Sequence, residues 1–164
     1  MRVFSFYIDG QVFAVDVNCI QKVARKMEIT KVPSSFDAIS GIINLKGRVV
    51  TVFSLYNILG LKVSSESILN VVNIIIFKSS SGQDQMGLII DKPGILINID
   101  DETIKLPSLA AGKEESYCIC GIAELDNTLY RIINIDSIIN KYKNNGRAHA
   151  EKTSNKGENS YETD

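Results

Sequence analysis

The sequence predicts a mainly β protein built from two small β-barrels of about five strands each, packed together, with short helices and a disordered C-terminal tail. Three observations support this prediction. Ile and Val recur in short runs of period two, as is typical of strands. One block of sequence occurs twice. Residues 143–164 contain no Ile, Leu, Val, Met or Phe, so they cannot bury enough apolar surface to fold.

Two hairpins with similar patterns and three helical segments are expected, besides the turns of the repeated block described next. Residues 3–17 alternate around Asp9–Gly10, a strong hairpin signal. Residues 73–91 repeat this pattern around a turn rich in Ser and Gly. We expect a short helix within residues 17–26, one or two helical turns over 54–60, and a terminal helix over 136–142.

The segment Gly41–Leu59 aligns without a gap with Gly121–Ile139, at an offset of 80 residues. Apolar positions match almost throughout, and Lys46–Gly47 and Asp126–Asn127 both fall where a tight turn would join two strands. Chance likeness between two hairpins is the alternative, and we favour a duplication. Each copy then predicts one barrel, made of a hairpin, a connection, a second hairpin and a closing turn. Two such small halves should pack together and leave a groove between them.

The composition excludes several classes of protein. The 164 residues carry a formal net charge of -1, whereas nucleic-acid-binding proteins usually show a basic excess. No run of about 18 apolar residues occurs, and the N-terminus lacks the pattern of a signal peptide. We therefore expect a cytoplasmic protein with no nucleic-acid partner and no direct insertion into a membrane.

The residues that catalysis or metal binding would need are scarce. The single histidine, His149, lies in the polar C-terminal stretch, so a His-based triad or a multi-His metal site is not expected. The three cysteines, Cys19, Cys118 and Cys120, do not suggest a disulfide framework. We expect no catalytic residue, no metal and no cofactor, and an enzyme that uses Asp91 or the thiols is a minor alternative. The sequence favours a binding module that recognises its partner by apolar contacts and exposed backbone.

One stretch resembles a known family. Ile29–Pro33 and then Ile39–Leu55 are similar to the signature of the CheW-like chemotaxis coupling proteins, in which a Thr-x-φ-Pro element precedes Gly-Val-Ile-Asn-Leu-Arg-Gly. Met86–Asp91 and Tyr117–Ile139 resemble later segments of the same family. The resemblance covers roughly residues 1–142. It implies a single domain over 1–142 with the fold of two five-stranded SH3-like barrels, followed by the tail at 143–164.

The resemblance also implies a function. Proteins of this family have no known catalysis. They bridge the cytoplasmic tip of a methyl-accepting chemoreceptor to the regulatory domain of the CheA histidine kinase. That kinase domain has the same double-barrel fold, so it and the coupling protein alternate in rings within receptor arrays. The implied location is cytoplasmic, with recruitment to membrane-associated receptor arrays. The alternative is a specialised regulatory module of a non-motility kinase pathway that does not bind a receptor directly.

Site residues follow from the resemblance position by position. The receptor tip, a helical hairpin in the groove between the barrels, would contact Ile20, Lys22, Gly41, Lys46, Gly87, Pro93 and Leu96. The kinase would contact Asn44, Lys46, Gly47, Val49 and Val50. Among these, the two glycines of the receptor set would allow a helix to approach closely. As alternatives, Gly41 could serve turn geometry alone, Ile20 and Leu96 could be core residues, and Asn44 could be bonded within its own turn.

Four positions depart from the family pattern. Lys46 stands where Arg is usual, which removes bidentate hydrogen bonding. Lys22 replaces a common Glu, Ser54 replaces an Asp, and Pro93 replaces a Val. These departures predict altered partner specificity rather than a different fold.

Overall fold

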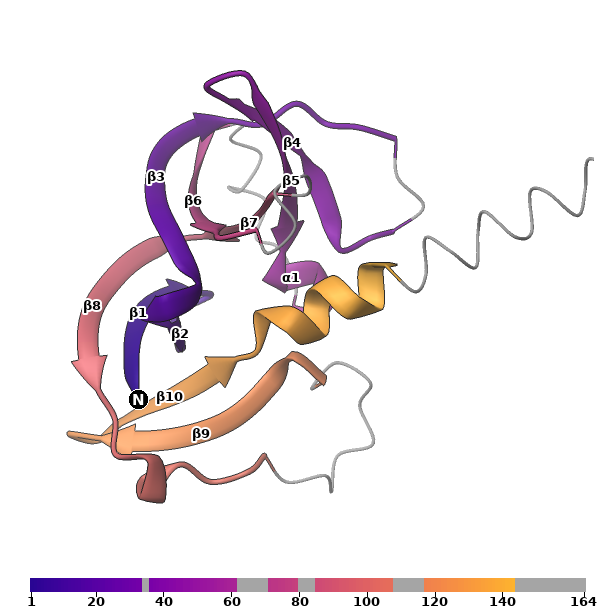
Figure 1. The fold of residues 1–164 in the computed structure, drawn as a ribbon. Coiled ribbons are helices and arrows are strands. Elements are labelled where there is room, and N and C mark those ends of the chain that lie inside the picture. Colours follow the sequence, from indigo (N-terminus) through magenta and orange to yellow (C-terminus); the bar gives the residue numbers. More distant parts are fainter. Residues whose placement is uncertain (34–35, 62–70, 80–84, 108–116, 144–164) are drawn as a thin grey trace, which may run out of the picture. The chain divides into compact units, whose positions relative to one another are not determined.

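The computed structural model describes residues 1–33, 36–61, 71–79, 85–107 and 117–143 (Figure 1). It divides into two compact units, Met1–Ile133 and Asn134–Asp164. In the second unit, the described residues form a helix over 135–143, which confirms the predicted terminal helix. The predicted disordered tail lies almost wholly outside the described residues.

The first unit contains two five-stranded sheets, as predicted (Figure 1). The first sheet has the order β8-β1-β2-β10-β9, and the second has the order β3-β6-β7-β5-β4. The strands are β1 (Arg2–Ile8), β2 (Gln11–Asp16), β3 (Ile20–Glu28), β4 (Ile39–Leu45), β5 (Arg48–Ser54), β6 (Val71–Phe77), β7 (Gln85–Ile90), β8 (Lys92–Asn98), β9 (Ile119–Leu125) and β10 (Thr128–Ile133). Short helical turns form η1 (Val17–Cys19), α1 (Leu55–Ile58) and η3 (Asp101–Thr103).

Each sheet closes on itself at one point. Thr30, just after β3, exchanges two backbone hydrogen bonds of 2.9 Å with Ile42 of β4. Lys105, after β8 and η3, exchanges bonds of 2.9 and 2.8 Å with Ile122 of β9. Since these bridges join the chain beyond one edge strand to the opposite edge strand, each sheet curls into a small barrel with fewer open edges.

Three predicted β-hairpin turns have the backbone that tight turns require. Asp9–Gly10, Lys46–Gly47 and Asp126–Asn127 all have positive φ at both residues, as in the type I′ turn that suits the twist of a hairpin. The predicted hairpin at 73–91 is also present, because β6 and β7 pair antiparallel. The turns at 46–47 and 126–127 are 80 residues apart, and the strands around them have the same order and bounds that agree within one residue, as the predicted duplication requires.

The two copies are intertwined, so the prediction that each copy forms its own barrel is wrong. The β1–β2 hairpin of the first copy lies in one sheet with β8, β9 and β10, and the β6–β7 hairpin lies in the other with β3, β4 and β5. For the second copy, the reason is the short connection after its first hairpin. Only Asp91 separates β7 from β8, and η1 alone separates β2 from β3. A one-residue link is too short for a hairpin, so the chain continues into the other sheet.

The short helix predicted within residues 17–26 is confirmed only as the single turn of η1 at its start, and the rest of the segment is a strand. Helical backbone ends after the single turn of η1, where the Asp16 carboxylate accepts a 2.8 Å hydrogen bond from the Asn18 N–H. From Ile20 the chain becomes β3 and pairs with β6. Pairing with a distant strand here outweighs the local preference. The helical turn predicted over 54–60 is confirmed as α1.

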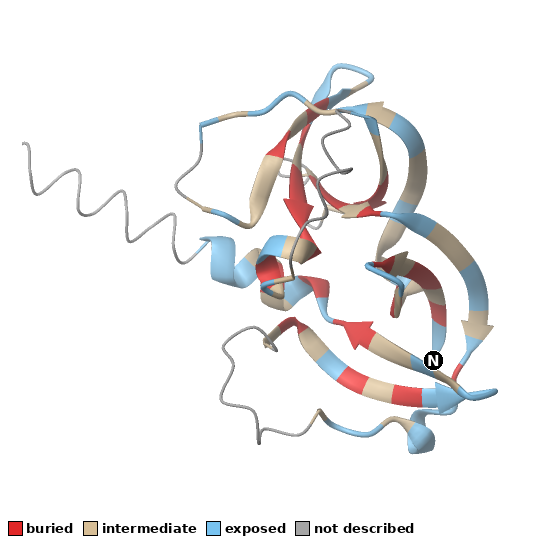
Figure 2. Ribbon diagram, turned by 180° about the vertical axis from the view of Figure 1, so that it is seen from behind, coloured by how far each residue is buried: buried red, intermediate tan, exposed pale blue. Residues whose placement is uncertain are grey.

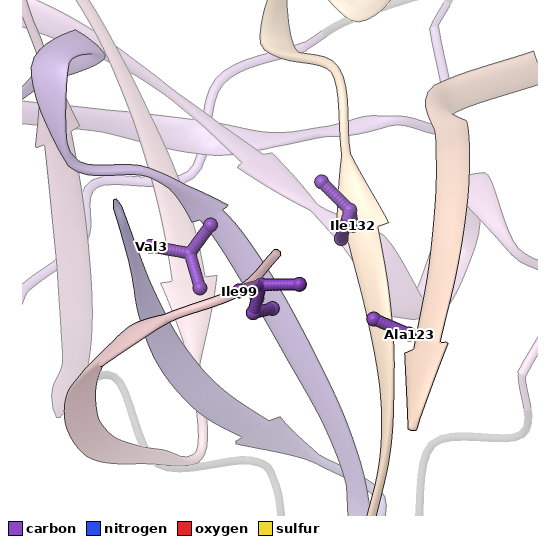
Figure 3. Close-up of a cluster of buried hydrophobic side chains, with 5 residues drawn as sticks. Val3, Ile99, Ala123 and Ile132 are labelled. Carbon is purple, nitrogen blue, oxygen red and sulfur yellow. The ribbon is translucent and has the colours of Figure 1, made fainter. Parts of the chain in front are cut away.

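A small apolar core lies inside each barrel and is formed by the buried residues of the strands (Figure 2). In the first sheet, side chains from four strands and the segment after β8 meet around Val3, Ile99, Ala123 and Ile132 (Figure 3). In the second, the cluster consists of Ile43, Val50, Val52, Ile74 and Ile76. The outward-facing side chains therefore project from strands that the packed cores hold in place.

Candidate functional site

The β4–β5 hairpin presents most of the predicted kinase contacts. Asn44, Lys46 and Gly47 are exposed, and Val49 is 59% exposed, whereas Val50 is fully buried in the core of the second sheet. The Asn44 Oδ1 accepts a 2.9 Å hydrogen bond from the Gly47 N–H. Asn44 is therefore bonded within its own turn, and it holds the exposed Lys46 in place.

The predicted receptor contacts are spread over several elements of both sheets. Ile20 and Lys22 lie half-buried on β3, and Pro93 and Leu96 lie on β8. Leu96 is 50% exposed, so it is not a core residue. The groove between the barrels stays a prediction. The described residues do outline an open hollow of about 500 Å³, but it contains none of the predicted residues and is lined by Val32, Phe36, Asp37, Ile39, Tyr56, Asn57, Gly60 and Leu61.

The two glycines of the predicted receptor set are buried and have a role inside the fold. A Cβ atom on Gly41 would overlap the carbonyl oxygen of Thr30 and lie 2.7 Å from Ile29 Cγ2. A Cβ atom on Gly87 would lie 2.7 Å from Ile74 Cγ2. Gly41 thus admits the segment that closes the second barrel. Contact of either glycine with a partner stays a prediction.

A bulge in β8 makes two neighbouring apolar side chains face outward. Gly94 and Ile95 lie opposite the single residue Ser5 of β1, so the alternation of side chains is broken. The buried Ser5 hydroxyl accepts a 2.9 Å hydrogen bond from the Ile95 N–H and donates one of 3.1 Å to the Ile95 carbonyl. Ile95 is 63% exposed beside Leu96. Our sequence reasoning missed Ile95, although Pro93–Gly94 within a strand is a signal for a bulge.

A polar cluster joins the two sheets, and the sequence did not reveal it. The Asp91 Oδ2 accepts a 2.6 Å hydrogen bond from the Tyr56 hydroxyl and a 2.8 Å bond from the Asp9 N–H. Burial, and then the hydrogen bond and negative charge of Asp91, raise the pKa of Tyr56 to about 12. The cluster connects the β1–β2 turn, α1 and the β7–β8 link. Asp91 is therefore a structural acceptor at the crossing between the sheets.

The residues that the structure describes contain neither a metal-binding cluster nor a membrane-spanning helix. No three His, Cys, Asp or Glu side chains there are grouped as a metal ion would require. None of the helices there has the length and apolar character needed to cross a bilayer.

Comparison with known proteins identifies the relatives of the chain. A sequence model described as "CheW-like domain" matches residues 2–143. The "Chemotaxis protein CheW" of Thermotoga maritima is 29% identical over 140 residues, covering 84% of this chain and 87% of that protein. The protein of the same name from Bacillus subtilis is 25% identical over 140 residues, covering 85% and 87%. The crystal structure of scaffolding protein TtCheW from Thermoanaerobacter tengcongensis superposes with a TM-score of 0.69 at 26% identity, covering 82% of this chain and 84% of that one.

Proposed function

The chain belongs to the CheW-like domain family, and we propose that it is a scaffold that couples methyl-accepting chemoreceptors to a CheA-type histidine kinase in chemotaxis-type signalling. The family consists of scaffolding proteins rather than enzymes. The observation that carries the proposal is the family match over residues 2–143, which includes the signature hairpin with its exposed turn. The protein would act in the cytoplasm, recruited to membrane-associated receptor arrays.

The kinase regulatory domain would dock on the β4–β5 hairpin. Val49 supplies exposed apolar surface, and Lys46 supplies a charge beside it. An apolar centre with a charged rim is the usual anatomy of a protein–protein interface. Asn44 and Gly47 would act by holding the turn, and the buried Val50 would act by anchoring β5 in the core.

The receptor tip would dock across β3 and β8. Ile20 and Lys22 on β3, and Pro93 and Leu96 on β8, combine apolar surface with one positive charge. Gly41 and Gly87 would support this surface from within, and Lys46 would contact the receptor at its edge. Because Lys22 reverses the charge usual in the family, its receptor should carry an acidic rather than a basic group opposite it.

Titration of the purified chain with its cognate kinase regulatory domain, with and without a receptor-tip fragment, tests the proposal. Binding to both partners is expected. The variant Lys46→Glu should weaken kinase binding about two- to fivefold without unfolding, because Lys46 is exposed. Lys105→Glu is a matched control, since it reverses an exposed charge on the first sheet outside both surfaces. A folded chain that bound neither partner would refute the proposal. Binding to the kinase alone would favour a regulatory module without a receptor.

A further inference from the structure

We propose that one end of the second sheet, formed by the bulge of β3 and the β4–β5 turn, is a cationic docking surface for an acidic segment of the kinase regulatory domain. Lys26, which our sequence reasoning did not single out, would be a specificity residue of this surface. The inference rests on the proposed function, and it adds the chemistry of the partner and a residue outside the family signature.

The first observation is the backbone of two lysines. Among the described non-glycine residues with positive φ, Asp9, Asp126 and Asn127 are of types that tolerate this region, but Lys26 (φ 52°) and Lys46 (φ 51°) are not. Lys26 is exposed within a β-bulge, a place where glycine would fit without strain. A strained residue that no packing requires is a pointer to function.

The bulge is held open by a side chain of the neighbouring strand. Arg25 and Lys26 lie opposite the single residue Asn73 of β6, and the Asn73 Oδ1 accepts a 3.3 Å hydrogen bond from the Lys26 N–H. Because two residues face one, Arg25 and Lys26 are adjacent in the sequence and yet both exposed.

The second observation is that the two strained lysines lie at the same end of the sheet. Thr30 pairs antiparallel with Ile42. Lys26 lies four residues before Thr30, and Lys46 lies four residues after Ile42. Because the two segments run antiparallel, both lysines lie on the same side of this bridge. The end of β3 and the β4–β5 turn occupy the same end of the second sheet in Figure 1 and Figure 2.

The third observation is the charge gathered at this end. Arg25, Lys26, Lys46 and Arg48 are all exposed, and none of them forms an ion pair with any part of the chain that the structure describes. Glu28 is the acidic residue on β3. This concentration of unpaired cations contrasts with a formal net charge of -1 for the whole chain.

The other barrel provides an internal comparison. Strand β3 pairs with β6 in the second sheet as β8 pairs with β1 in the first. The pairs Val23–Ile75 and Met27–Val72 therefore correspond to the pairs Pro93–Phe6 and Ile97–Val3. In this alignment Arg25 and Lys26 correspond to Ile95 and Leu96, while Lys46 and Arg48 correspond to Asp126 and Thr128. All four cations are therefore absent from the equivalent end of the first sheet. The fold does not require them, which leaves recognition as the reason for their presence.

The chemistry of the occupant follows from this surface. The exposed Val49 lies on the same hairpin as Lys46 and Arg48, so basic side chains flank its apolar surface. The complementary surface is an apolar patch with a rim of Asp and Glu side chains. Such a rim accelerates encounter and discriminates between partners, and it does so more strongly at low salt.

The double variant Lys26→Gly/Lys46→Gly tests the inference, since glycine keeps both positive-φ backbones and removes both charges. Its affinity for the cognate kinase regulatory domain should fall about fivefold at about 50 mM NaCl, and by less than about twofold at about 500 mM. Its Tm should stay within about 2 °C of the wild type or rise. Two controls should bind normally: Asn127→Gly, which changes a positive-φ residue without a charge, and Arg2→Gln/Lys105→Gln, which removes two exposed charges from the first sheet.

The outcomes separate the two proposals. A wild-type chain that fails to bind the regulatory domain would refute the proposed function and this inference with it. A double variant that binds like the wild type at both salt concentrations would overturn the inference and leave the proposed function standing. The inference would also be overturned if phosphatidylcholine vesicles containing phosphatidylserine sedimented the wild type but not the double variant, because the surface would then recognise a membrane.

Discussion

Replacing Gly41 with alanine should destabilise the protein much more than the same change at the turn glycine Gly47 or at Gly121, the equivalent glycine of the other barrel. The added methyl group would overlap the carbonyl oxygen of Thr30, which is one of the two atoms that accept the closing hydrogen bonds of the second barrel. It would also lie 2.7 Å from Ile29 Cγ2. Backbone cannot move aside as a side-chain end can, so the closing segment would have to shift.

Two contributions set the size of the effect. Overpacking of this kind costs about 1–3 kcal/mol. The two closing bonds between Thr30 and Ile42 contribute about 1 kcal/mol each if they are lost. A shift of the closing segment would relieve the overlap but would weaken these bonds, so the two contributions do not add in full. We therefore expect the free energy of unfolding to fall by about 3 kcal/mol. That is a large fraction of the about 5–15 kcal/mol that stabilises a typical domain.

Urea unfolding followed by circular dichroism measures this loss, and two matched variants calibrate it. Gly47→Ala has a positive φ of 82° but open space around the new atom, so it should cost about 1 kcal/mol. Gly121→Ala, at the equivalent position of the other barrel, would meet Ile104 Cγ2 at 2.5 Å and the Lys105 carbonyl oxygen only at 3.8 Å. A side chain can yield there, and we expect about 1 kcal/mol. If Gly41→Ala were no worse than these two variants, our account of barrel closure would be wrong.

Two further predictions concern the polar groups. Tyr56→Phe should cost about 1 kcal/mol near neutral pH through the lost bond to Asp91. Since folding raises the pKa of Tyr56 from 10 to about 12, its stabilising effect is complete below pH 10 and disappears as the pH rises through about 12. Absorbance at 295 nm reports tyrosine ionisation, and the wild-type titration curve minus that of the variant isolates Tyr56. Its midpoint should lie near pH 12, and a midpoint near pH 10 would contradict the hydrogen bond between Tyr56 and Asp91. Ser5→Ala should lower stability by about 1–3 kcal/mol, because it leaves the Ile95 N–H unpaired in the β8 bulge. Thermal unfolding measures this loss, and a Tm equal to that of the wild type would show that the bulge does not need the hydroxyl.

Local patterns were sufficient for the elements whose cause is local. The Asp-Gly pair at 9–10 and the glycine at 47 predicted tight turns because Asp and Gly are among the few residue types that accept positive φ, and the structure has these turns. The duplication was visible because both copies repeat the same alternation of apolar residues. For the candidate site, the positions came from the resemblance to a family, and no property of composition or spacing would have indicated a receptor or a kinase.

Long-range pairing accounts for the rest. Residues 20–28 became β3 rather than a helix because β6, far along the chain, satisfies their backbone. The exchange of strands between the copies follows from the link at Asp91, whose length matters only once two sheets compete for the next strand. The outward direction of Lys26 and Ile95 depends on bulges opposite Asn73 and Ser5, and a bulge is a property of two paired strands. The sequence of one strand predicts which side chains alternate between the two faces. It does not show where pairing with another strand introduces a bulge that breaks this alternation.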